Sequence, residues 1–419
     1  MSRKKIREYD AKKLLSNNLA NYGYEMKLEV ALADQTSIDD NFTKLSAENP
    51  WLKTKKLVIK PDQLIGKKGK HNLVLLNADF DAAKKFIKEN MGKTLEVQKI
   101  NGVLTHFIIE PFVEHGDEYF LAIMSKRDHD VILFSEKGGV DVEENWDAVM
   151  HFEVPIDSDA DSIEINIPLQ GDKKAKMISF IKALYKYSVD FGCTYIEMNP
   201  ISFDKNNELK PLGFVCELDD CEYFKCETKW DGLEFPEQFG RKKYQEEEFV
   251  TQLDDKTGAS LKLTVINPEG KIWLLVAGGG ASVIYTDTVV DLGYGNELGN
   301  YGEYSGDPNE EETYQYSKTV LDLATRKNGK ILLIGGGVAN FTNVANTFKG
   351  IIRALREAKE KLKKNKMQIY VRRGGPNFEE GLKMMKELGK ELEIPIEVYG
   401  PETHMTKIVD LAVNHLKSG

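Results

Sequence analysis

Three apolar runs in the second half of the chain end in clusters of glycine and arginine. The runs and the clusters that follow them are Ile272–Ala277 before Gly278–Gly280, Ile331–Ile334 before Gly335–Gly337, and Ile369–Val371 before Arg372–Gly375. Glycine lets backbone N–H groups approach an anion closely, and the start of a following helix adds unpaired donors and a positive dipole end. Arginine binds carboxylate or phosphate through its planar fork. The pattern predicts an oxyanion pocket for a multiply charged acid or a phosphate.

The same loops contain neutral polar residues, namely Ser282, Asn340 and Thr342. Asn and Thr side chains recognise a hydroxyl group or a second carboxylate. The alternative is that the glycines only make tight turns from strand to helix. The spacing matches neither Gly-x-Gly-x-x-Gly nor Gly-x-x-x-x-Gly-Lys-Ser/Thr, so it supports neither a nicotinamide dinucleotide site nor a P-loop.

A lysine-rich loop in the first half suggests a second anion site. Lys60 ends an apolar run, and a basic loop containing Lys68 and Gly69 follows. Such a loop can close over a triphosphate and neutralise its charge during phosphoryl transfer, although most lysine-rich loops are solvated turns. Further on, Glu197 and Asn199 end another strand and offer oxygen ligands that suit Mg²⁺. The order of these features favours a nucleotide site.

The elements around these residues predict two differently built halves. In the second half, apolar strands alternate with amphipathic helices, which predicts a parallel sheet covered on both faces with ligands outside its carboxyl edge. In the first half, strands and helices alternate irregularly, which favours an α+β arrangement. A charge run and glycines between Trp230 and Glu248 indicate the boundary. The expected helices are 82–89, 175–190, 313–325, 344–364, 379–388 and 407–416, and the expected strands are 57–60, 72–77, 107–110, 119–124, 131–134, 272–277, 331–334, 369–371 and 396–399.

Composition excludes several classes of protein. The chain has 419 residues, 41% of them hydrophobic, and its net charge is −10, which disfavours non-specific nucleic-acid binding. No apolar run reaches the length of a membrane span, and the N-terminus lacks an apolar signal core. Four cysteines are too few for a disulfide scaffold, so we expect a reducing, cytoplasmic setting. Cys216, Cys221 and Cys226 are read as buried thiols, with an irregular zinc site as the alternative.

Seven stretches together resemble the ATP-citrate lyase family, in the nucleotide- and citrate-binding subunit of its two-chain form, over nearly the whole chain. They are Lys-Pro-Asp-Gln-Leu at 60–64, Glu-Pro-Phe-Val at 110–113, Gly-Ala-Ser-Leu-Lys-Leu at 258–263, Val-Ala-Gly-Gly-Gly-Ala-Ser-Val at 276–283, Asn-Tyr-Gly-Glu-Tyr-Ser-Gly at 300–306, Ala-Asn-Phe-Thr-Asn at 339–343 and Val-Arg-Arg-Gly-Gly-Pro-Asn at 371–377.

The resemblance implies an α/β protein with two domains. Residues 1–242 would form an ATP-grasp (α+β) nucleotide-binding domain of two subdomains, split near residue 111. Residues 243–419 would form a citrate-binding, doubly wound parallel-sheet domain of the flavodoxin-like CoA-ligase type, similar to that of succinyl-CoA synthetases.

The resemblance also implies functional residues. Those that match nucleotide-binding positions are Lys60, Lys68, Gly69, Pro111, Val113 and Glu118. Those that match metal-binding positions are Asn199 and, at a second ion site, Asp254, Thr257 and Ala259. Those that match citrate-binding positions are Gly306, Asn340, Thr342 and Arg373. Mg²⁺, ATP and CoA would take part, with CoA mainly on a partner chain.

One position departs from the family pattern. The family has an aspartate ligand for magnesium and nucleotide about fourteen residues after Asn199, and Gly213 stands there in this chain. Glycine has no side chain that could bind a metal ion. The alternatives are that Glu217 or Asp219 replaces the aspartate, that the alignment slips by one or two residues, or that phosphoryl transfer is weakened.

The family chemistry passes a phosphoryl group from ATP through a histidine to citrate and yields citryl-CoA, then acetyl-CoA and oxaloacetate. None of the seven histidines lies in a glycine-rich loop; His404 comes closest and is read as structural. We therefore expect no catalytic residue in this chain and a second subunit that carries the phospho-histidine, the CoA site and the lyase. The alternatives are an acyl-CoA (citryl-CoA or succinyl-CoA) synthetase subunit and a non-catalytic citrate-binding scaffold.

Overall fold

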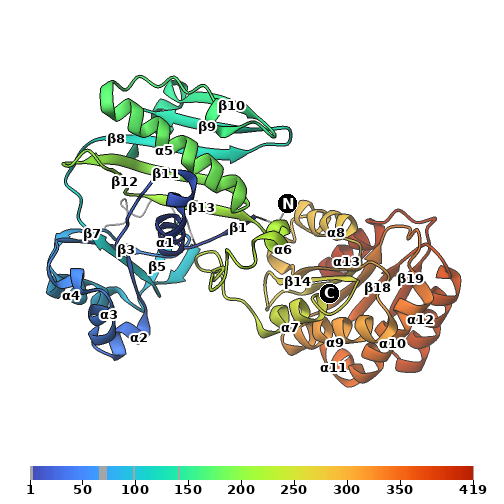
Figure 1. Cartoon of the computed structure of the whole chain (residues 1–419). Coiled ribbons are helices and arrows are strands. Elements are labelled where there is room, and N and C mark those ends of the chain that lie inside the picture. Colours follow the sequence, from blue (N-terminus) through green and yellow to red (C-terminus); the bar gives the residue numbers. More distant parts are fainter. Residues whose placement is uncertain (1–2, 66–72, 98–99, 140–141, 419) are drawn as a thin grey trace. The chain divides into compact units, whose positions relative to one another are not determined.

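The computed structural model describes residues 3–65, 73–97, 100–139 and 142–418. The chain divides into two compact units, Met1–Lys242 and Lys243–Gly419 (Figure 1). Among the described residues, no helix is both long and apolar enough to cross a membrane.

The first unit is built on an antiparallel sheet with the strand order β1–β13–β11–β8–β9–β10 and with β12 paired to β11. Its strands are β1 (Arg3–Lys5), β8 (His115–Ser125), β9 (His129–Ser135), β10 (Met150–Pro155), β11 (Cys193–Asp204), β12 (Leu209–Pro211) and β13 (Phe214–Asp219). Successive side chains of a strand point to opposite faces. On β8, Tyr119, Leu121 and Ile123 therefore share one face, and they pack in one core with α1 (Glu8–Asn18) and α5 (Gly171–Asp190). Figure 1 labels these two helices and the strands of the sheet.

A smaller antiparallel sheet of the first unit has the order β2–β7–β3–β4. Its strands are β2 (Ala31–Ala33), β3 (Leu57–Pro61), β4 (Leu75–Ala78) and β7 (Phe107–Pro111). Strands β5 (Thr94–Val97) and β6 (Ile100–Val103) pair antiparallel in a separate two-stranded sheet. The helices nearby in sequence are α2 (Gln35–Asp39), α3 (Thr43–Glu48) and α4 (Phe80–Asn90). Val58 pairs with Glu110 and Lys60 with Ile108. Because directly paired residues share a face, Lys60 and Glu110 are diagonal neighbours on one side of this sheet.

The second unit contains a sheet of six strands in the order β14–β16–β15–β17–β18–β19. The strands are β14 (Ser260–Val265), β15 (Ile272–Ala277), β16 (Asn300–Ser305), β17 (Ile331–Gly336), β18 (Gln368–Arg372) and β19 (Ile396–Tyr399). Only β14 runs antiparallel to its neighbour, and the other five strands are parallel. The predicted parallel sheet is confirmed.

Helices cover both faces of this sheet. The helices of the second unit are α7 (Gln245–Asp254), α8 (Gly279–Asp291), α9 (Glu310–Arg326), α10 (Val344–Glu357), α11 (Lys359–Asn365), α12 (Phe378–Leu392) and α13 (Lys407–Ser418), and a short α6 (Tyr223–Cys226) lies near the end of the first unit. Helices α9, α10 and α12 share one core with the sheet, and α8 and α13 share the core of the opposite face (Figure 1).

The structure departs from the sequence-based expectations in several elements. Helices α1 and α7 and strands β14 and β16 are among those that were not predicted. The helix expected over 344–364 is two helices, since Ala358 between them has φ −84° and ψ 0° and ends the hydrogen-bonded run of α10. The strand expected over 72–77 begins later, at Leu75.

Candidate functional site

The carboxyl ends of four parallel strands lie side by side in the second unit, because β16, β15, β17 and β18 are neighbours in that order. The loops after three of them contain the residues predicted to hold citrate. Gly306 follows β16, Asn340 and Thr342 follow β17, and Arg373 follows β18. Thr342 and Arg373 are buried, whereas Asn340 is exposed. The fold brings all four positions to one sheet edge.

Hydrogen bonds tie the loop after β17 to its neighbours on both sides. The Ala339 N–H donates to the Gly374 carbonyl at 3.0 Å, which joins this loop to the one after β18. The Asn343 N–H donates to Asp307 Oδ1 at 3.2 Å, which joins it to the turn after β16. The Asn343 side chain in turn caps α10 by accepting from the Asn346 N–H. One backbone bond and one bond to a side-chain carboxylate therefore join the three loops.

Arg373 is a buried cation with few partners. Its side chain is 4% exposed, and Nη1 donates to the Gly337 carbonyl at 2.8 Å. Its Nε has no hydrogen-bond partner in the described part of the chain. Burial lowers the pKa of its guanidinium. A Cβ on Gly336 would lie 2.7 Å from Nη1, so glycine there makes room for the arginine. Unused donors on a desolvated guanidinium are what a buried anion would satisfy.

Two other polar residues of these loops are structural. Arg372 donates to three backbone carbonyls, those of Thr403 at 2.9 Å, Gly336 at 3.0 Å and Pro401 at 3.2 Å. It therefore holds the turn after β19 against the end of β17. Ser282 is buried and donates to the Gly302 carbonyl at 2.7 Å, which ties α8 to β16.

The three residues predicted for a second ion site lie in one turn between α7 and β14. Asp254 accepts the Leu261 N–H at 2.7 Å through Oδ1 and pairs with Lys262 through Oδ2. The Thr257 hydroxyl donates to the Ala259 carbonyl at 3.3 Å and accepts the Ala259 N–H at 3.2 Å. The Thr257 and Ala259 oxygens lie together in this turn, and both carboxylate oxygens of Asp254 already have partners.

Gly306 connects this turn to the sheet edge. Its φ of +75° lies in the left-handed region that favours glycine. A Cβ there would lie 3.2 Å from Ala259 Cα. The predicted ion turn and the predicted citrate loops are therefore in direct contact.

In the first unit, Lys60 is almost completely buried and its ammonium group is surrounded by acceptors. It contacts Glu8 Oε1 at 2.7 Å, Glu110 Oε1 at 2.8 Å and the Leu212 carbonyl at 2.6 Å. Burial alone would lower the pKa of Lys60, but Glu110 and Glu8 outweigh burial and raise it. Lys68 and Gly69, the other residues predicted to bind phosphates, lie outside the described residues.

Pro111, Val113 and Glu118 lie in the segment that connects the two sheets of the first unit. Pro111 is the last residue of β7. The ring of His115 contacts the Val113 carbonyl through Nδ1 at 2.7 Å and Glu118 Oε1 through Nε2 at 3.2 Å. A Cβ on Gly139 would lie 2.6 Å from Glu118 Oε2, so the 138–139 turn closes on this carboxylate. The His115 ring therefore links Val113 to Glu118, and Pro111 lies at the start of the same segment.

Asn199 and Gly213 face each other where β11 meets β13. Asn199 Oδ1 accepts the Gly139 N–H at 2.7 Å, and the Asn199 N–H donates to the Gly213 carbonyl at 3.2 Å. A Cβ on Gly213 would lie 2.2 Å from the Asn199 carbonyl oxygen. This backbone leaves no room for an aspartate at 213.

The two carboxylates considered as replacements for the missing aspartate have other partners. Glu217 pairs with Lys5 at 3.2 Å and with Arg3 at 3.9 Å. Asp219 Oδ1 accepts the Cys221 N–H at 3.0 Å. Within the described ranges there is no group of three or more His, Cys, Asp or Glu side chains that could hold a metal ion.

The contacts of His404 and of the cysteines are those of structural residues. His404 is exposed, and its Nδ1 contacts the Thr406 hydroxyl at 2.9 Å. Cys193 and Cys216 are buried with their Sγ atoms 3.8 Å apart, and Cys226 is also buried. Cys221 is exposed, so the expectation of a buried thiol is wrong at that position, because it lies in the turn after β13.

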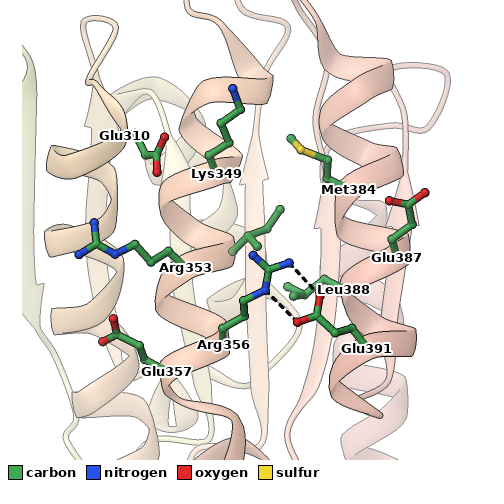
Figure 2. Close-up of a pocket in the computed structure, with 10 residues that line it drawn as sticks. Glu310, Lys349, Arg353, Arg356, Glu357, Met384, Glu387, Leu388 and Glu391 are labelled. Atoms are coloured by element: carbon green, nitrogen blue, oxygen red, sulfur yellow. Dashed lines mark hydrogen bonds and ion pairs between the residues drawn. The ribbon is translucent and has the colours of Figure 1, made fainter.

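One cavity of about 470 Å³ lies away from these loops, on the outer side of α10 and α12 (Figure 2). The residues that line it include Glu310, Lys349, Arg353, Arg356, Met384 and Glu391. Figure 2 shows Arg356 in a two-pronged contact with Glu391, at 2.9 and 2.8 Å. Arg353 donates to Glu311 at 2.7 Å. Both arginines of this cavity are therefore paired with carboxylates, unlike Arg373 at the sheet edge.

Sequence reasoning missed the buried charges around Lys60. Glu8 and Lys12 form an i,i+4 pair on α1, and Lys12 is 1% exposed. The spacing alone is typical of a solvated helix face, so it gave no sign of burial. The partners of Lys60 come from positions 52 and 152 residues away in sequence.

Comparison with known proteins agrees with this architecture. Residues 2–230 match the family described as "ATP-citrate synthase ATP-grasp domain", and residues 241–415 match "ATP citrate lyase citrate-binding". The chain is 50% identical over 422 residues to ATP-citrate synthase alpha chain protein 2 of Oryza sativa subsp. japonica, covering 99% of this chain and 98% of that protein. It is 46% identical to ATP-citrate synthase of Homo sapiens, covering 90% of this chain but 35% of that protein.

A solved structure is equally similar. ATP citrate lyase from Methanothrix soehngenii, in complex with citrate and coenzyme A, superimposes with a TM-score of 0.89 at 49% identity, covering 99% of this chain and 100% of that chain. The ATP-grasp domain, the parallel-sheet domain and the sequence similarity all agree over nearly the full length. The chain belongs to the ATP-citrate lyase family, as a subunit of an ATP-dependent citrate-cleaving enzyme.

Proposed function

We propose that this chain is the subunit of a two-chain ATP-citrate lyase that binds citrate at the carboxyl edge of the second unit and MgATP in the first. The observation that carries the citrate site is Arg373, a buried guanidinium with an unsatisfied Nε at the edge where three glycine-containing loops are joined. Citrate is a trianion and would supply the missing acceptors. The residues proposed to hold it are Gly306, Asn340, Thr342 and Arg373.

The proposed nucleotide site uses Lys60, Lys68, Gly69, Pro111, Val113 and Glu118. Glu197 and Asn199 lie two residues apart on β11 and therefore share one face of the strand. Their side-chain oxygens are ligands that suit a hard cation, which also takes ligands from substrate phosphates. When bound, Mg²⁺ neutralises phosphate charge. The turn of Asp254, Thr257 and Ala259 is the proposed second ion site.

The proposed reaction passes a phosphoryl group from ATP to a histidine of the partner chain and from there to a citrate carboxylate. CoA then displaces phosphate to give citryl-CoA, and cleavage yields acetyl-CoA and oxaloacetate. Within this chain, Arg373 and the loops would orient citrate. The entropy of orienting citrate is then lost when it binds, which lowers the barrier of the later reaction step. The partner would supply the phospho-histidine, the CoA site and the lyase.

The test is ADP release by this chain with and without its partner. We expect ADP release that requires the partner, citrate and CoA, with acetyl-CoA and oxaloacetate as products. Release that is independent of citrate would contradict the proposal. Accumulation of citryl-CoA or succinyl-CoA without cleavage would instead identify an acyl-CoA synthetase.

Gly213 favours one rival function, a citrate-binding scaffold that does not use ATP. The position where the family has an acidic ligand has no side chain and no room for one. Titration of the full chain with MgATP and with citrate, followed by calorimetry, separates the two functions. Binding of both ligands supports the catalytic subunit, whereas binding of citrate alone supports the scaffold.

A further inference from the structure

Two buried lysines in the first unit share the same three acceptors. Lys12 on α1 contacts Glu110 Oε2 at 2.5 Å, Glu8 Oε1 at 3.0 Å and the Leu212 carbonyl at 3.2 Å. Lys60 on β3 contacts Glu8 Oε1, Glu110 Oε1 and the same Leu212 carbonyl. An ammonium group has three N–H donors. Both lysines are therefore fully engaged, and Lys60 has no donor left for a phosphate.

The cluster spans the two sheets of the first unit. Lys60 and Glu110 belong to the smaller sheet, and Leu212 lies between β12 and β13 of the larger one. Glu8 also accepts the Phe214 N–H at 3.2 Å, so the backbone on both sides of Gly213 is bonded to the cluster. Lys60 therefore contacts Glu8 and the Leu212 carbonyl, which connect the cluster to the backbone on either side of Gly213, beside the proposed metal site.

The charges of the four side chains cancel. Lys12 and Lys60 are 1% and 8% exposed, and Glu8 is 7% exposed, so each charge is largely removed from water. Removing one charge from a buried, balanced set leaves an uncompensated partner at high cost. If the Lys60 side chain moved out of the cluster, Glu8 and Glu110 would still have Lys12 as a counter-ion. Without Lys12, the departure of Lys60 would leave two buried carboxylates unpaired.

We propose that Lys12 is a positioning residue for Lys60. In the nucleotide-free chain, Lys60 is held by Glu8, Glu110 and the Leu212 carbonyl, and it exchanges to the nucleotide phosphates while Lys12 stays behind to neutralise both carboxylates. Lys12 thereby sets the free-energy cost of releasing Lys60. The inference rests on the proposed nucleotide role of Lys60.

The experiment measures the Kd of MgATP and of citrate by calorimetry on the full chain. Lys12→Met should weaken MgATP binding by roughly tenfold or more, because a smaller fraction of the chain can release Lys60. Citrate binding should not change, and Lys12→Arg should restore MgATP binding. Glu110→Gln should have the opposite effect and tighten MgATP binding, because it loosens the hold on Lys60. A gain in affinity does not arise from a damaged fold, so this variant keeps the test decisive should Lys12→Met fold poorly.

A double-mutant cycle with Lys60→Met completes the test. Once Lys60 is gone, Lys12→Met should weaken MgATP binding no further. An equal loss of MgATP affinity in both backgrounds, a parallel loss of citrate affinity, or no gain from Glu110→Gln would overturn the inference and leave the proposed function intact. Unchanged MgATP binding by Lys60→Met itself, or no binding by the unmodified chain, would overturn the proposed nucleotide role and this inference with it.

Discussion

Arg372 and Arg373 are adjacent buried arginines with opposite roles in the folded chain. The three carbonyl partners of Arg372 would lose their donors in Arg372→Met. Buried carbonyl groups without a donor destabilise the folded state. We expect a loss of about 2–4 kcal/mol in the free energy of unfolding, measured by urea denaturation.

Arg373→Met should behave in the reverse way. It removes a buried charge with an unsatisfied Nε, so the free energy of unfolding should change by less than about 1 kcal/mol or increase. Citrate affinity should fall by roughly a hundredfold, since a charge-assisted bidentate contact is lost. The two variants control for each other. Equal stability losses, or unchanged citrate affinity in Arg373→Met, would contradict the assignment.

Replacing Gly213 with the aspartate that the family has at this position would strain the backbone. A Cβ there would lie 2.2 Å from a backbone oxygen of Asn199, and a backbone oxygen has little freedom to move away. Gly213→Asp should therefore cost about 2–3 kcal/mol of stability and should not tighten MgATP binding. Gly116→Asp is the matched control for stability, because no atom lies within 4 Å of a Cβ at Gly116. Tighter MgATP binding by Gly213→Asp at unchanged stability would contradict this reading.

Asp10 makes stability depend on pH. Burial raises its pKa from 3.8 to about 6, against the opposing charge of Arg7. A carboxyl group with a raised pKa in the folded state binds its proton more tightly there than in the unfolded chain, so its contribution to stability falls as pH rises from about 4 to about 6. Asp10→Asn should raise the free energy of unfolding by about 1–2 kcal/mol at pH 7.5, after allowance for partial solvent screening, and by almost nothing at pH 4. Denaturation curves at both pH values check this, and an equal effect at both would contradict it.

At the scale of elements, helices α10 and α12 are joined by a surface ion pair above an apolar contact (Figure 2). The side chains of Arg356 and Glu391 are 54% and 49% exposed, so water screens their attraction. Arg356→Ala should cost less than about 1 kcal/mol. Leu388→Ala, at a position 1% exposed, should cost about 2–4 kcal/mol because it leaves a cavity. Thermal unfolding of both variants compares them, and a reversed order would contradict the argument.

The apolar strands of the second unit could be predicted because both faces are buried. Every residue of β15 and β17 is buried, and such strands read as continuous apolar runs. Strand β14 alternates buried with more exposed residues, and β16 contains polar residues and Gly302, which packs against the Tyr316 hydroxyl. Neither has the apolar run by which its neighbours were identified.

The candidate site was only partly predictable, because some of its contacts come from residues that are distant in sequence. The loops that meet at the sheet edge follow from strand order, and the sequence shows where each strand ends. The difference between Arg372 and Arg373 depends on which carbonyls each reaches, and these lie 29 to 36 residues away in sequence. The buried surroundings of Lys60 likewise come from distant segments, so a lysine-rich stretch alone could not reveal them.

At the scale of the whole molecule, the two units have separate hydrophobic cores. The core around β8, β11, α1 and α5 contains residues of Met1–Lys242 only, and the core around β15, β17, α9 and α10 contains residues of Lys243–Gly419 only. Units with their own cores can unfold separately. Each ligand should therefore stabilise its own unit.

We expect calorimetry of the full chain to show two unfolding transitions that respond to different ligands. Citrate at about a hundred times its Kd should stabilise one transition by about 2.7 kcal/mol, and MgATP should shift only the other. Trp273 is the single tryptophan of residues 243–419 and is fully buried, so its fluorescence in a 243–419 fragment assigns the transition that citrate shifts. The 1–242 fragment is the control and should respond to MgATP alone. One transition shifted by both ligands would contradict separate sites, because a ligand bound to one independent unit leaves the unfolding of the other unchanged.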